Sequence, residues 1–177
     1  ALVGTALLGA LVIVLDYAMK FSGWKIPFPW LPVLKFDFSG IPIVLALLLY
    51  GLRSGATTSA IAFLAILLRS GDLVGASMKA LAEFSTILGM APFVFRPSKA
   101  GRTLSFILAL VDRAAVMSMF NLVVLPVFYP QTYSFPAAVV LIPMVVVFNV
   151  MAGCISIFGG YLIHKVIMRR ISSATTQ

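Results

Sequence analysis

Apolar runs long enough to cross a lipid bilayer dominate this sequence and restrict what it can fold into. The longest extends from Pro136 to about Ile167 and contains no acidic residue. A bilayer core about 30 Å thick is crossed by roughly 20 helical residues at about 1.5 Å each. The chain is 62% hydrophobic and 10% charged, whereas soluble domains have about 25% charged residues. We therefore predict an all-α integral membrane protein rather than a soluble domain.

Six apolar runs predict a single six-helix transmembrane domain over residues 1–177, with short second and third spans. We interpret the first run as a span and not a signal peptide, because no small-residue cleavage site separates it from the next segment of the chain. Pro126 is predicted to mark the end of the fifth helix, and Pro143 to bend the sixth. The predicted spans are approximately 1–19, 40–51, 55–69, 73–96, 102–129 and 136–168.

The segment between the first two spans, Trp24 to Ser39, has a different composition. It contains three prolines and five aromatic residues. Proline removes an amide donor and pushes the preceding residue toward extended conformations, so a helix is not expected here. Trp24 and Trp30 suit a membrane interface. We predict an ordered loop at the outer surface, with a plain interfacial anchor as the alternative interpretation.

The distribution of positive charge predicts the orientation. The chain carries 13 Lys and Arg against five Asp and Glu, a net charge of +8. In a membrane protein this excess indicates topology before it indicates nucleic acid, which we do not expect as a partner. With the N-terminus inside, seven cations fall on inner segments (Arg53, Arg96, Lys99, Arg102, Lys165, Arg169 and Arg170) and four on outer ones (Lys20, Lys25, Lys35 and Arg69). Both termini are thus predicted to be cytoplasmic, in a multi-pass plasma-membrane protein.

Four polar residues within the predicted spans mark a candidate pocket. Lys79 and Glu83 are four residues apart on one helical face, where they can neutralise each other. Counted from the outer helix ends, the four residues Lys79, Glu83, Asn121 and Asn149 lie about 9 to 20 Å deep. Three helices therefore bring polar groups to similar depth beneath an aromatic loop, as in a mostly apolar small-molecule pocket. The simpler alternative is that the ion pair and the amides only fasten helices together.

The other intramembrane charges and the histidine receive different interpretations. Asp112 and Arg113 are adjacent, point in different directions and are assigned structural or coupling roles. We reject His164 as a metal ligand because no second His or Cys lies nearby. A single cysteine, Cys154, excludes an intramolecular disulfide and a Cys-based metal cluster. No metal is therefore expected.

Several segments together resemble the S component, the substrate-binding membrane subunit, of energy-coupling factor (ECF) vitamin transporters, and most closely the riboflavin-specific type. The resemblance covers nearly the whole chain. It implies six helices with cytoplasmic termini and an outer first loop that acts as a lid. The segments are LKFDFSGIP (Leu34 to Pro42), ALAEF (Ala80 to Phe84), NLVVLPVFY (Asn121 to Tyr129) and FNVMAG (Phe148 to Gly153).

The resemblance also implies site residues and partners. Riboflavin is the implied substrate, with no cofactor, and a membrane coupling (T) subunit and two ATP-binding subunits are the implied partners. No Gly-rich phosphate loop occurs in this chain. Ala6 and Ala10, four apart on the first helix, form a small-residue face that would meet the coupling subunit. The implied substrate-binding residues are Leu34, Phe36, Asp37 and Phe38 in the lid, with Lys79, Glu83, Asn121 and Asn149.

Alternatives to riboflavin binding remain open. The chain departs from the riboflavin-type pattern at two positions, and two other protein classes have to be considered. Glu83 stands where riboflavin-type members tend to have Asn, and Ala152 where they tend to have Lys, so another vitamin or precursor such as pantothenate is the alternative substrate. An intramembrane enzyme would need a nucleophile with a base or a metal set, and we expect no enzyme. A scaffold without ligand predicts that the four intramembrane polar residues can be replaced without loss of any binding.

Overall fold

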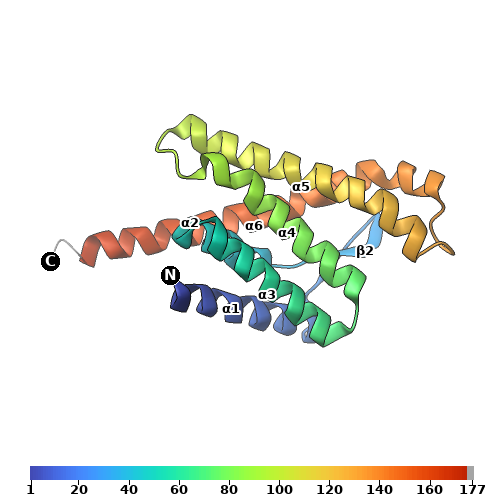
Figure 1. Cartoon of the computed structure of the whole chain (residues 1–177), viewed down its shortest axis with the longest axis horizontal. Coiled ribbons are helices and arrows are strands. Elements are labelled where there is room, and N and C mark those ends of the chain that lie inside the picture. Colours follow the sequence, from blue (N-terminus) through green and yellow to red (C-terminus); the bar gives the residue numbers. More distant parts are fainter. Residues whose placement is uncertain (175–177) are drawn as a thin grey trace.

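The computed structural model describes residues 1–174, and only the backbone of Pro32, Val33 and Ala174. In this part of the chain six helices follow one another, with a short β-hairpin between the first two (Figure 1). The predicted all-α six-helix architecture is confirmed. The elements are α1 (Leu2–Phe21), β1 (Ile26–Phe28), β2 (Leu31–Phe36), α2 (Gly40–Tyr50), α3 (Leu52–Ser70), α4 (Leu73–Val94), α5 (Lys99–Phe128) and α6 (Phe135–Ala174).

Five of these helices have the length and hydropathy of a membrane span, and α2 does not. α2 has 11 residues and is therefore only about 16 Å long. Most of its residues, from Gly40 through Leu47, are buried, and it packs mainly against α6 and α3. It is apolar on all sides because protein surrounds it, so the predicted second span is an internal half-length helix. Gly51, with φ of 88°, makes the turn into α3.

The sixth helix is longer than predicted. It continues to Ala174 rather than to about 168 and has 40 residues, about 60 Å at helical rise. The basic residues Lys165, Arg169 and Arg170 end the apolar run, but no glycine or proline follows them to end the helix. The last turns extend past the other helices at the end of the molecule where α1 begins (Figure 1).

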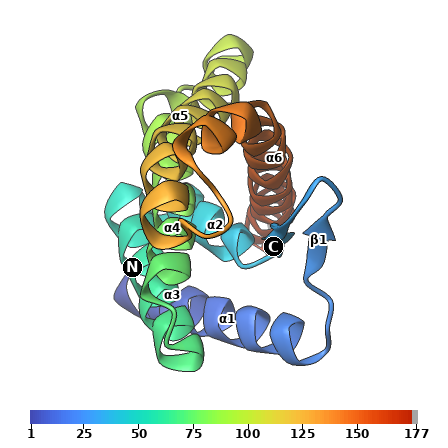
Figure 2. The same ribbon diagram turned by 90° about the vertical axis from the view of Figure 1, so that its right-hand side faces the viewer.

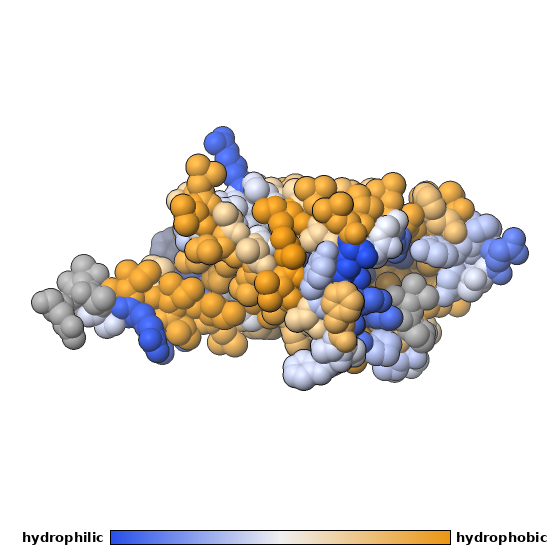
Figure 3. All heavy atoms as spheres, turned by 90° about the horizontal axis from the view of Figure 1, so that it is seen from below, coloured by the Kyte–Doolittle hydropathy of each residue, from blue (hydrophilic) through white to orange (hydrophobic). Residues whose placement is uncertain are grey.

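Large apolar side chains cover the outside of the bundle. Leu7, Val14, Val123 and Val140 are among many that are more than half exposed. Hydrophobic residues cover much of the face shown in Figure 3, and polar groups gather toward its ends and in a patch to the right of the middle. A surface of this kind is stable against lipid and not against water.

The segment predicted as an ordered loop forms an antiparallel β-hairpin. Ile26 pairs with Phe36 and Pro27 with Lys35, and the register is irregular after Pro27. The prolines favour the extended backbone that a strand needs, although strands were not predicted from the sequence. Phe28 of the hairpin packs against Phe148 of α6 with ring centroids 5.6 Å apart. The end-on view of Figure 2 shows the hairpin beside α6.

Candidate functional site

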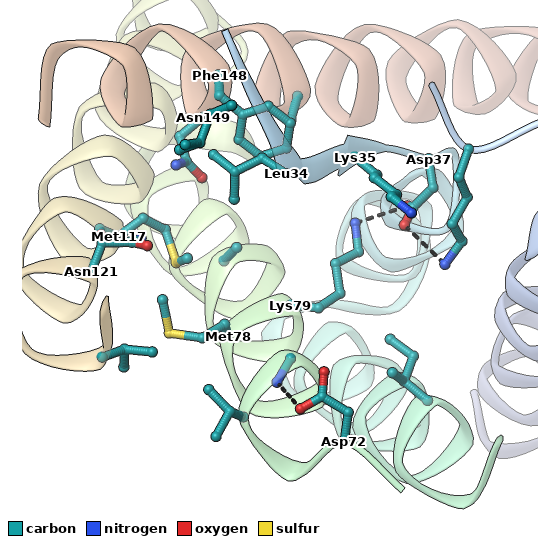
Figure 4. Close-up of a pocket in the computed structure, with 18 of the residues that line it drawn as sticks. Leu34, Lys35, Asp37, Asp72, Met78, Lys79, Met117, Asn121, Phe148 and Asn149 are labelled. Carbon is teal, nitrogen blue, oxygen red and sulfur yellow. Dashed lines mark hydrogen bonds and ion pairs between the residues drawn. The ribbon is translucent and has the colours of Figure 1, made fainter. Parts of the chain in front are cut away.

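A cavity of about 360 Å³ lies beneath the hairpin and is lined by residues of the hairpin and of α1, α3, α4, α5 and α6 (Figure 4). A cavity of this size can hold a small organic molecule. Six basic and three acidic residues line it, together with amide, aromatic and aliphatic side chains. The charged lining residues are Lys20, Lys25, Lys35, Arg69, Lys79, Arg113, Asp37, Asp72 and Glu83.

Lys79 connects the hairpin segment to the helical wall of the cavity. Its ammonium lies 2.8 Å from Asp37 Oδ1, just after β2, and 2.8 Å from Glu83 Oε1, one turn further along α4. The bond to Glu83 confirms the sequence prediction that these two side chains share a face. The bond to Asp37 was not predicted, because Asp37 is 42 positions away in the chain.

Asp37 is held as a carboxylate by its surroundings. Burial raises its pKa, but the ammonium groups of Lys79 and Lys25 and the hydroxyl of Ser39 oppose this more strongly, and the net pKa lies well below its usual range. Ser39 donates to Asp37 Oδ1 from both its backbone N–H, at 3.1 Å, and its hydroxyl, at 2.7 Å. The end of the hairpin therefore presents a fixed negative charge to the cavity.

A second ionic contact ties the base of the hairpin to two helices. Asp16 of α1 is fully buried. It accepts hydrogen bonds from Lys25, just before β1, and from Arg69 Nε of α3 at 2.7 Å. Lys25 also lies 3.8 Å from Asp37 Oδ2. Alternating charges thus run from α3 and α1 through the hairpin to α4.

The floor of the cavity is a buried polar cluster around Glu83 and Arg113. Arg113 Nη1 lies 3.2 Å from Glu83 Oε1, and Glu83 Oε2 accepts a hydrogen bond from Ser156 at 3.2 Å. Beyond this cluster, toward the end where the chain begins, lies an apolar core that includes Ile87 and Ala109. The cavity is therefore closed on that side and faces the hairpin.

The two predicted amides lie on facing helices of the wall. Asn121 Nδ2 donates to Met117 O at 2.7 Å. Asn149 Nδ2 donates to Val145 O at 2.8 Å, and its Oδ1 accepts from Arg113. Each amide donates one N–H to its own helix, and this bond fixes the orientation of the side chain. Each amide therefore keeps further hydrogen-bonding capacity.

Six of the eight predicted substrate-binding residues line the cavity: Leu34, Asp37, Lys79, Glu83, Asn121 and Asn149. Phe36 and Phe38 are not part of its wall. Phe36 packs against Phe148 with ring centroids 4.8 Å apart, and Phe38 is 41% exposed. From Lys35 to Phe38 the side chains alternate, with Lys35 and Asp37 at the cavity and Phe36 and Phe38 away from it.

Several charged lining residues were missed from the sequence, and Arg113 is the most deeply buried of them. Its side chain is 2% exposed and lines the cavity, whereas the neighbouring Asp112 does not. Arg113, Met117, Asn121 and Leu125 repeat every four residues and are all buried. The spacing of eight residues before Asn121 places Arg113 on the same helical face, and this signal could have identified it.

The small-residue face of α1 lies away from the cavity. Ala6 and Ala10 are exposed, whereas Gly9 between them is buried. A Cβ at Gly9 would lie 2.6 Å from Ile61 Cδ1 of α3. Glycine therefore serves packing inside the bundle, and the two alanines face outward.

A family match and a similar curated protein both relate this chain to transporters. Residues 1–163 match the family described as "ECF transporter, substrate-specific component". A similar curated protein is the riboflavin transporter FmnP of Bacillus subtilis (strain 168), 32% identical over 105 residues, which are 56% of this chain and 55% of that protein. The chain thus matches about half the length of that relative.

A solved structure is similar over the whole fold. It is described as the S component of a bacterial ECF transporter, has a TM-score of 0.77 and 26% sequence identity, and the match covers 99% of this chain and 97% of that one. The family is a transporter subunit and not an enzyme. The family match over most of the chain and the shared fold show that this protein belongs to the substrate-specific S components of ECF transporters.

Proposed function

We propose that this S component binds riboflavin and serves its uptake. The observation that carries the proposal is the cavity beneath the hairpin, which Asn121 and Asn149 line together with apolar and aromatic side chains. A flavin offers a flat apolar ring for such a wall, with carbonyls, ring nitrogens and hydroxyls for a few polar groups. The partial match to a riboflavin transporter supports the same substrate.

The proposed orientation places both termini in the cytoplasm and the hairpin outside. The seven cations assigned to inner segments include Arg96, Lys99 and Arg102, in and beside the turn between α4 and α5. The N-terminus and the end of α6 lie at one end of the molecule and the hairpin toward the other (Figure 1). The positive-inside rule supports this orientation, in which the cavity receives its solute from outside.

In this orientation the hairpin acts as a lid. It is fastened at its base by Lys25 to Asp16 and at its end by Asp37 to Lys79. These contacts are ionic and partly exposed, whereas the packing of Phe28 on Phe148 is apolar. Phe36 also packs against Phe148, so opening has to break these two ionic contacts and two aromatic contacts, without unfolding a helix.

The proposed partners are a membrane coupling subunit and two ATP-binding subunits that supply energy. The exposed Ala6 and Ala10 on α1 form the proposed contact with the coupling subunit, because small residues let another helix approach closely. Release of the solute to the cytoplasm is proposed to follow reorientation of this subunit against the coupling protein, since the cavity floor is closed.

A visible absorption spectrum of the protein purified from cells grown in rich medium tests the substrate. We expect a co-purifying flavin spectrum, with no cofactor required for binding. Colourless protein that leaves added riboflavin fluorescence unchanged would contradict the proposal.

A second candidate substrate within the same family is a vitamin that carries a carboxylate, such as pantothenate. The observation that favours it is the excess of basic residues around the cavity. Lys20 and Lys35 line it and form no ion pair with any described residue. Competition between riboflavin and pantothenate for the purified protein separates the two candidates.

A further inference from the structure

The guanidinium of Arg113 is only partly used by the protein. Its Nε donates to Asn149 Oδ1 at 3.3 Å, and its Nη1 donates to Thr86 Oγ1 at 3.0 Å and to Ala82 O at 3.4 Å. These bonds use three of the five N–H groups of an arginine. None of the described residues accepts a hydrogen bond from Nη2, so two N–H groups are left.

The unpaired Nη2 is open to the cavity rather than enclosed in protein. Ser118 Oγ is the one fully buried side-chain polar atom without a partner among the described residues. Nη2 is therefore not sealed, although the side chain is 2% exposed. Since Arg113 lines the cavity, its two remaining donors face the space where a solute would lie.

The neighbouring helix leaves room for this arginine. A Cβ at Gly153 of α6 would lie 3.2 Å from Arg113 Cδ and 2.8 Å from Leu110 Cδ2. The next residue toward the hairpin, Ala152, is also small and lines the cavity. The α6 backbone thus accommodates the arginine stem, and no large side chain from positions 152 or 153 covers the guanidinium.

We propose that Arg113 is a specificity-determining residue that binds a carbonyl oxygen of the solute ring through Nη2. The inference rests on the proposed riboflavin function, and the partner is then a carbonyl of the pyrimidine half of the flavin. A bond from a charged donor at the closed floor of the cavity is stronger than a neutral one.

The charge balance favours a neutral carbonyl over a carboxylate at this position. At the floor, the cations Lys79 and Arg113 both contact Glu83, and Lys79 also contacts Asp37. Each of these cations therefore already has an anion partner, and an added carboxylate would be a buried charge without an ion partner of its own.

The test is flavin affinity in the full chain with the substitution Arg113→Lys, which keeps the positive charge beside Glu83 and removes the guanidinium fork. We expect riboflavin to bind about 10- to 100-fold more weakly, the loss of a hydrogen bond to a charged group. The same substitution at Arg102, which donates to Tyr161 at 2.9 Å away from the cavity, is the matched control and should leave affinity unchanged.

Ligand analogues give a readout that a general structural defect would not produce. Sulfur is a weak acceptor, so 2-thioriboflavin or 4-thioriboflavin should bind the wild-type protein more weakly, whichever of the two replaces the carbonyl that Arg113 binds. Arg113→Lys should then add little further loss for that analogue. Equal losses for riboflavin and both analogues would overturn the direct contact, because they would indicate a structural effect.

The outcomes separate this inference from the proposed function. A wild-type protein that binds no riboflavin overturns both. A wild-type protein that binds riboflavin, with Arg113→Lys binding equally well, overturns only the role of Arg113. If Arg113→Lys does not fold, the wild-type protein decides: unchanged affinity for both thio analogues overturns the inference. Pantothenate binding that Arg113→Lys abolishes overturns the neutral carbonyl in favour of a carboxylate.

Discussion

The ion pair between Asp37 and Lys79 should control how long a bound solute stays beneath the hairpin. The substitution Asp37→Asn keeps the size of the side chain and an oxygen that can accept from Ser39, but removes the charge that Lys79 contacts at 2.8 Å. Lys79 and Asp37 are 20% and 6% exposed, so solvent screens this contact only in part.

The size of the effect depends on the contacts that each partner retains. A hydrogen bond to a charged group contributes about 1.5–3 kcal/mol. Lys79 keeps Glu83 as a partner at 2.8 Å, so its charge is not stranded and the lower half of that range applies. About 1.5–2 kcal/mol corresponds to a dissociation rate roughly 10- to 30-fold faster, provided that release requires the hairpin to open.

The assay is stopped-flow recovery of flavin fluorescence after riboflavin-loaded protein is mixed with an excess of a non-fluorescent competitor. Asp112→Asn is the matched control, because Asp112 is the same residue type on a wall helix and does not line the cavity. A dissociation rate for Asp37→Asn within twofold of the wild type would refute the reasoning that this ion pair fastens the lid.

The same contact predicts the pH dependence of release. The pKa of Asp37 in the closed structure lies below its ordinary value of 3.8. A carboxyl with a lowered pKa stabilises the closed form above its ordinary pKa and loses that contribution as the pH falls toward the lowered value. The Asp37 contribution should thus be constant from pH 5 to pH 8. We expect equal ratios of mutant to wild-type dissociation rates at the two pH values, and a ratio that approaches one at pH 5 would contradict the assignment.

Three further substitutions test other parts of the structure. Asn149→Leu should weaken riboflavin binding by at least about tenfold with little loss of thermal stability, and unchanged affinity in a folded protein would show that the pocket is wrongly assigned. Leucine at both Ala6 and Ala10 should leave affinity unchanged but prevent co-purification with the coupling subunit, and retained co-purification would place that contact elsewhere. Gly40→Ala puts a Cβ against the Glu83 carboxylate and Ser156 and should lower the free energy of unfolding by about 1–3 kcal/mol, and an unchanged thermal midpoint would show that these groups shift freely.

The number and order of helices could be predicted from the sequence because lipid imposes a simple length requirement on apolar runs. The same reasoning failed for α2, where an apolar run of 11 residues is buried by protein instead of lipid. It also placed the end of α6 too early, because hydropathy reports where the lipid ends and not where a helix ends.

The candidate site could be predicted in part. Depth along each helix brought Lys79, Glu83, Asn121 and Asn149 to similar depth, and all four line the cavity. Depth says nothing about rotation about the helix axis, so Arg113 was assigned elsewhere although it lies two turns from Asn121 on the same face.

Contacts between distant segments could not be derived from the spacing of residues. The contacts of Asp37 with Lys79 and of Lys25 with Asp16 depend on how the hairpin folds back over the helices. The contact of Arg69 with Asp16 depends on how α3 packs against α1. Prolines in the segment indicated extended backbone, but the register that carries each side chain inward or outward is set by pairing between the strands.

The central claim is that this chain binds a flavin in the cavity beneath the hairpin. The most direct measurement is a fluorescence titration of riboflavin with the purified protein, carried out in parallel with Asn149→Leu. Saturable quenching at about one equivalent for the wild-type protein, and at least about tenfold weaker quenching for the variant, is the predicted result. Wild-type protein that leaves flavin fluorescence unchanged, or a folded variant that quenches equally well, would contradict the claim.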